Sequence, residues 1–152
     1  MASGAVSAFG TFLRMGDGAS PENFATIAEV KSISGPKMSM DTIDVTNHSS
    51  GIPWREYMAG LSDAGEITFD VNFIPTNATH SASTGMLADM INRTRRNYQI
   101  IFPDTGHTAW QFLGFVTGFE TGEEIDNVIT SSVTIKVTGK PTFSGITNTT
   151  TA

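Results

Sequence analysis

The chain has 152 residues, a mass of 16.2 kDa and a formal net charge of −6, with 39% hydrophobic residues and no cysteine. A chain of this length buries roughly 70% of its unfolded surface in a core of its own, so we expect one globular domain, synthesised in a cytoplasm. The missing cysteine excludes disulfides, thiol catalysis and cysteine-ligated metal centres, and the pI near 4.8 is opposite to what a DNA-binding surface requires.

The first part of the chain contains two short segments that alternate between apolar and polar residues. Residues 11–15 and 26–33 each predict a β-strand. An Asp-Gly pair at residues 17–18 predicts a turn between them. In the second segment Ile27 and Ile33 share one face, so we expect one continuous strand there.

Residues 38–58 do not fit a compact domain. They alternate weakly at first and then become a loop that carries Ile52 and Trp54. Compact domains avoid structureless loops longer than about 12–15 residues unless the loop is functional. Two interpretations stay open: an arm that contacts another subunit, or a segment that returns Trp54 to its own core. The candidate arm residues are Met38, Met40, Ile43, Val45, Ile52, Trp54 and Tyr57.

Residues 65–73 carry the clearest strand pattern in the chain. One predicted face holds Ile67, Phe69, Val71 and Phe73, and the other holds Glu66, Thr68, Asp70 and Asn72. The preceding residues 60–65 superficially resemble the turn that presents a catalytic serine, but their spacing is wrong for that motif. We interpret them as the turn before the strand.

One helix is predicted over residues 83–95. Its apolar stripe is Met86, Leu87, Met90 and Ile91. A helix this short is not stable alone, so the stripe must cover a sheet. Three arginines gather at its C-terminal end, where cations favour the helix dipole: Arg93, Arg95 and Arg96.

Three further strands are predicted at residues 97–102, 110–119 and 129–137, with a hairpin loop at residues 104–107. The middle one is apolar on both faces and predicts a central strand. The expected fold is mainly β (α+β): an antiparallel β-sandwich or rolled barrel over residues 1–143, with one flanking helix and a long protruding loop. The uncharged tail, residues 144–152, is expected to be disordered.

No motif for catalysis, a metal or another cofactor is found. His48, His80 and His107 are isolated from one another and lie in predicted loops, where surface histidines are common. The densest acidic cluster matches no calcium-binding loop and is interpreted as a solvated hairpin turn; it holds Glu120, Glu123, Glu124 and Asp126. No apolar run reaches the roughly 18 residues of a membrane-spanning helix, so neither an enzyme nor a membrane protein is expected.

Three ordered motifs carry a family resemblance. A strand ends in Gly-Pro at residues 35–36, Asp-Thr-Ile-Asp-Val-Thr follows at residues 41–46, and Gly-Leu-Ser-Asp-Ala-Gly at residues 60–65 precedes the alternating strand. In this order they resemble the major tail tube proteins of long-tailed, non-contractile bacteriophages. The likeness extends from about Gly10 to Phe143.

The resemblance implies a structural protein of the virion. Its copies would form hexameric rings that stack into a hollow tube, with tape measure, tail tip and terminator proteins as further partners, and DNA would pass through the lumen without specific binding. The arm would reach a neighbouring subunit or ring. A lumen lined by carboxylates repels phosphates, and the candidate lumen residues are Glu66, Asp70, Glu120, Glu123, Glu124 and Asp126.

Two alternatives remain open. One is the tube protein of a type VI secretion-like system, which shares the fold implied by the resemblance. The other is a small β-sandwich that binds a carbohydrate or peptide on aromatic platforms, for which the candidates are Trp54, Tyr57 and Trp110.

Overall fold

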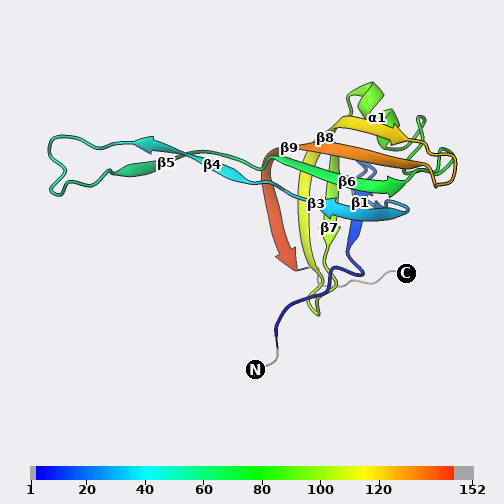
Figure 1. Cartoon of the computed structure of the whole chain (residues 1–152), viewed down its shortest axis with the longest axis horizontal. Coiled ribbons are helices and arrows are strands. Elements are labelled where there is room, and N and C mark those ends of the chain that lie inside the picture. Colours follow the sequence, from blue (N-terminus) through cyan, green and yellow to red (C-terminus); the bar gives the residue numbers. More distant parts are fainter. Residues whose placement is uncertain (1–2, 146–152) are drawn as a thin grey trace.

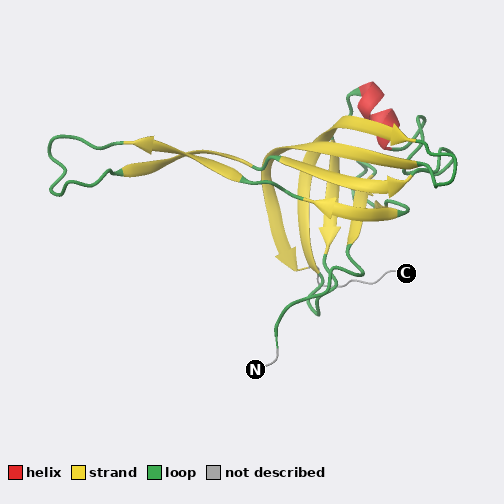
Figure 2. Ribbon diagram, viewed as in Figure 1, coloured by secondary structure: helices red, strands yellow, loops and turns green. Residues whose placement is uncertain are grey.

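The computed structural model describes residues 3–145. A rolled antiparallel sheet forms the body, one short helix packs against it, and a two-stranded arm projects away from it (Figures 1 and 2). The elements in chain order are β1 (Phe12–Gly16), β2 (Phe24–Thr26), β3 (Val30–Ser34), β4 (Ser39–Asp44), β5 (Tyr57–Asp63), β6 (Glu66–Asn72), α1 (Met86–Asn92), β7 (Arg96–Ile101), β8 (Thr108–Gly122) and β9 (Thr130–Gly145). The predicted mainly-β fold with one flanking helix and a protruding arm is confirmed.

The body is a seven-stranded sheet in the order β2-β1-β7-β8-β9-β6-β3, and every neighbouring pair is antiparallel. Its two longest strands, β8 and β9, pair with register shifts between Gln111 and Leu113 and between Val116 and Gly118. Such irregularities bend a strand and increase its twist. They let the sheet roll around its own apolar face.

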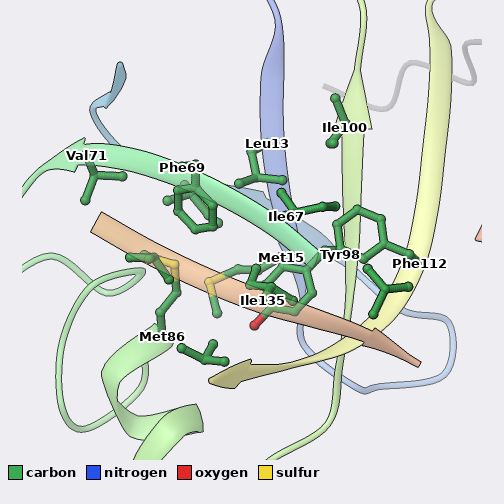
Figure 3. Close-up of a cluster of buried hydrophobic side chains, with 14 of the residues drawn as sticks. Leu13, Met15, Ile67, Phe69, Val71, Met86, Tyr98, Ile100, Phe112 and Ile135 are labelled. Carbon is green, nitrogen blue, oxygen red and sulfur yellow. The ribbon is translucent and has the colours of Figure 1, made fainter. Parts of the chain in front are cut away.

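Alternating side chains from five strands fill the enclosed core (Figure 3). On β6, Ile67, Phe69 and Val71 are buried while the residues between them are exposed, as predicted. The neighbouring strand β9 contributes its own buried series, and β7 adds Tyr98. Because successive strand residues point to opposite faces, the same alternation gives the sheet a polar outer face.

Three predictions, for a strand, a turn and the tail, are corrected by the structure. The continuous strand expected over residues 26–33 is divided into β2 and β3, because Glu29 has a left-handed backbone with a φ of 57°. The expected turn at residues 60–65 belongs largely to β5, which continues to Asp63. Strand β9 extends to Gly145, so the first two residues of the tail expected to be disordered lie in a strand. Residues 146–152 lie outside the described part.

The helix is shorter than predicted and buries a different face. It covers only Met86–Asn92, and its buried residues are Met86, Ala88 and Asp89, whereas the predicted stripe residues Met90 and Ile91 are exposed. The reason is a charged pair: Asp89 turns inward to meet Arg96 on β7. Arg96 therefore begins a strand instead of capping the helix. The one helix among residues 3–145 is not long and apolar enough to cross a membrane.

Candidate functional site

The arm is the most conspicuous feature outside the body (Figure 1). Strands β4 and β5 pair only with each other, in an antiparallel register that places Ile43 opposite Met58 and Asp44 opposite Tyr57. Trp54 is 73% exposed. The sequence left open whether this segment projects as an arm or returns Trp54 to its own core. In the structure it projects as an arm, and Trp54 does not return to the core.

The base of the arm is fixed to the body by polar contacts. Asp63 at the end of β5 accepts hydrogen bonds from the Lys136 ammonium at 3.1 Å and from the Gly65 N–H at 2.8 Å. These two donors, the backbone N–H first, hold the pKa of Asp63 below its ordinary value. Gly65 has a φ of +74°, and a Cβ at this position would strike the Lys37 carbonyl. The arm therefore leaves the body in a defined direction.

The tip of the arm is held by hydrogen bonds of its own. The Val45 N–H donates to the Glu56 carbonyl at 2.9 Å, and the Glu56 N–H donates to the Thr46 hydroxyl at 2.8 Å. The Ser50 hydroxyl donates to the Glu56 carboxylate at 2.9 Å. Thr46 also bonds to Asp44 and keeps the pKa of that carboxyl low. The hairpin is thus preorganised within one chain.

The arm exposes an unusual number of large apolar side chains. All seven candidate residues named from the sequence are exposed: Met38, Met40, Ile43, Val45, Ile52, Trp54 and Tyr57. Two further exposed apolar residues were not among the candidates. Met58 is the last residue of the predicted arm, and Leu61, which is 84% exposed, lies in the segment that the sequence assigned to a turn. Contiguous exposed apolar surface of this kind marks interaction sites. The arm is therefore a candidate contact surface.

The six candidate acidic residues fall into two groups. Asp70 on β6 and Glu120 on β8 both lie opposite Ser132 of β9, so they share the outer face of the sheet, and Glu66 lies farther along that face opposite Lys136. Glu123, Glu124 and Asp126 are exposed in the loop after β8. No group of acidic or histidine residues in the described part is arranged to hold a metal ion.

His80 is not the surface residue that the sequence suggested. It is fully buried, and its Nδ1 accepts the Ile74 N–H at 3.1 Å. With that nitrogen acting as acceptor, Nε2 is the protonated one and donates to the Ala28 carbonyl at 2.8 Å. His80 thus fastens the loop before α1 to the segment between β2 and β3, and its role is structural.

The three aromatic side chains proposed as ligand platforms lie on different parts of the fold. Trp110 on β8 packs edge-on against Phe102 and Phe143, at ring-centroid distances of 4.9 and 5.3 Å. Trp54 and Tyr57 belong to the arm. This arrangement gives no common ligand platform.

Comparisons with known proteins identify a family and a shared fold. The model of a family described as lambda phage tail tube protein matches residues 10–144. No curated protein matches the chain.

Several solved structures share the fold. The chain is similar to a protein in the tail of an empty gene transfer agent particle with C6 symmetry, at 22% identity and a TM-score of 0.69, covering 92% of this chain and 99% of that one. It is similar to the SPP1 tail tube at 9% identity and a TM-score of 0.71, covering 95% and 82%. A chain in the PVC sheath-tube complex of an extracellular contractile injection system matches at 16% identity and a TM-score of 0.68, covering 95% and 94%.

Proposed function

Because this chain belongs to the family of lambda phage tail tube proteins, we propose that its copies stack as hexameric rings into the hollow tail tube of a virion and conduct DNA to the host. The observation that carries the proposal is the family match, which covers residues 10–144. The likeness to a gene transfer agent tail with C6 symmetry supports the hexameric ring. The role is structural and not catalytic.

Two features of the chain support self-assembly. The arm presents its apolar side chains to the outside. The terminal strands of the sheet, β2 and β3, each have one edge that is not paired with another strand among residues 3–145. Open edges pair readily with other strands, so edge pairing between copies would close the ring while the arms join one ring to the next.

The direct test is electron microscopy of the purified protein in negative stain. Concentrated protein, alone or with the tail components that initiate assembly, is expected to form rings or hollow tubes whose end-on views show sixfold symmetry. A protein that stays monomeric under all these conditions would overturn the proposal.

The outer face of β6, β9 and β8 is our proposed channel wall. Its carboxylates, Asp70 and Glu120, alternate with hydroxyl groups such as that of Ser132. Acids predominate on this face, and such a wall repels phosphates. Its cations are few: Lys136 lies opposite Glu66 and is paired with Asp63, and Lys31 lies beside Asp70 and Glu120. The loop acids at residues 123–126 form the second candidate group.

Charge reversal tests which group lines the channel. Tubes of the Asp70→Lys, Glu120→Lys variant are expected to retain short DNA duplexes at low salt and to release them as salt rises, because new phosphate contacts form. Co-sedimentation of labelled duplex with the tubes measures the effect, with unaltered tubes as the reference. If Glu123→Lys, Glu124→Lys tubes retain DNA instead, the loop and not the sheet face lines the channel.

At the ends of the tube, we expect tape measure, tail tip and terminator proteins as partners. A second candidate function is the tube of a contractile or type VI secretion-like system, favoured by the fold shared with the contractile injection system. Neighbouring genes distinguish the two: terminase, portal and tape-measure genes support the phage tail, whereas sheath and ATPase genes support the secretion system.

A further inference from the structure

One face of the arm combines apolar and acidic side chains. Ile43 lies opposite Met58, and Val45 continues this register opposite Glu56. Asp41 lies at a register irregularity between Met40 and Thr42. Its Cβ is 3.2 Å from the place that a Cβ on Gly60 would occupy, and Gly60 is two residues after Met58 on β5, so Asp41 lies on the same side as Met58. We call this set the acidic arm face: Asp41, Ile43, Val45, Glu56 and Met58.

The two acids on this face have no cationic partner among residues 3–145. The other two arm acids are paired within the chain, Asp44 with Arg55 and Asp63 with Lys136. Glu56 accepts only the Ser50 hydroxyl through its carboxylate. The acidic arm face therefore presents two uncompensated negative charges around three exposed apolar side chains, Ile43, Val45 and Met58.

The complementary pattern lies at the end of α1. Met90 and Ile91 are exposed, Ile91 by 64%, and the exposed Arg93 and Arg95 follow directly. Neither arginine has an ion-pair partner in the described part, whereas the neighbouring Arg96 is bound to Asp89. We call this set the helix patch: Met90, Ile91, Arg93 and Arg95.

The two surfaces lie at opposite sides of the molecule, with α1 on the side of the body away from the arm (Figure 1). The arm therefore cannot reach the helix patch of its own chain. Two unlike complementary surfaces on one subunit form a head-to-tail contact, which either closes into a ring or continues as an open stack. Because the sheet edges are proposed to close the ring, the contact between arm and helix patch is the one that continues from ring to ring. The acidic loop at residues 123–126 would repel the arm face, so charge favours the helix patch over that loop.

We propose that the acidic arm face of one copy docks on the helix patch of another copy. The apolar side chains bury one another, and Arg93 and Arg95 pair with Asp41 and Glu56 across the contact. This inference rests on the proposed tube function and names the surface that receives the arm.

Charge reversal and its rescue test the contact. The Arg93→Glu, Arg95→Glu variant is expected to raise the minimum protein concentration for tube formation at least about tenfold, because like charges then face each other. Adding Asp41→Lys and Glu56→Lys to the same chain is expected to restore tubes. The matched control is Lys37→Glu, Lys140→Glu, which makes the same charge change at two exposed lysines that lack ion pairs among residues 3–145 and lie outside the arm face, the helix patch and the sheet edges. It should assemble like the unaltered chain.

Thermal unfolding of all variants checks that the fold is unchanged, since all substituted residues are exposed. If Arg93→Glu, Arg95→Glu assembles as well as the unaltered chain, or if the control fails equally, the helix patch does not receive the arm, while the tube function stands. If the Arg93→Glu, Arg95→Glu variant forms tubes that no longer bind another tail protein, the helix patch binds that partner and the inference is wrong. Absence of tubes from the unaltered chain would overturn the tube function itself.

Discussion

Replacement of residues 43–58 by Asn-Gly is expected to give a chain that folds normally but forms no tubes. Thr42 and Ala59 are paired partners in the arm, so a two-residue turn can close the shortened hairpin between them. The contacts at the arm base, from Asp63 to Lys136 and Gly65, stay in place. The body loses no strand pairing because β4 and β5 pair only with each other.

The loss of assembly follows from what is removed. The deleted segment carries most of the exposed apolar side chains of the arm, including Trp54 and Met58. Negative-stain microscopy and sedimentation measure assembly, and thermal unfolding measures the fold. A second variant, Ile52→Ser, Trp54→Ser, keeps the arm at its full length. It tests whether assembly depends on the apolar side chains of the arm or only on the length of the arm. Tubes from the truncated chain would show that the arm is not the joining element. A truncated chain that does not fold would contradict the first part of the prediction and show that the arm is part of the fold.

The sequence predicted those parts of the fold whose pattern is local. Strand β6 alternates over its whole length because one face is buried and the other is exposed. The arm was predicted as an excursion because it is long and apolar, but its second strand was missed. β5 is exposed along nearly its entire length, so it has no alternation to detect.

Features that depend on distant partners were not predictable. The helical spacing of Met90 and Ile91 predicted that these two residues face the core. Instead Asp89 faces the core, because its partner Arg96 lies on a separate strand, β7. His80 is buried, and its ring donates to the Ala28 carbonyl, 52 positions earlier in the chain, which no local pattern indicates. Asp70 and Glu120 share a face only through the registers of both with β9, which the sequence does not specify.

The pair of Asp89 and Arg96 is the charged contact on which we expect stability to depend most. Asp89 is 3% exposed, and Arg96 donates to both of its carboxylate oxygens, from Nε at 2.6 Å and from Nη2 at 2.5 Å. The remaining Nη1 donates to the Gly16 carbonyl at 2.7 Å. One guanidinium thus joins α1 and β1 to β7. Its bonds with Asp89 raise the pKa of Arg96, which keeps it charged at every accessible pH.

Substitution of Asp89→Asn is therefore expected to lower the free energy of unfolding by about 3–5 kcal/mol, because a partly buried cation loses its counter-charge. Urea unfolding followed by tryptophan fluorescence measures this as a lower midpoint with an unchanged slope. The matched control is Asp44→Asn, which breaks the exposed pair with Arg55 and should leave the midpoint unchanged. Equal, small effects of the two substitutions would mean that the buried pair contributes no net stability. In that case the burial of Met86 and Ala88 would hold α1 in place, Met86 through its contacts in the core cluster.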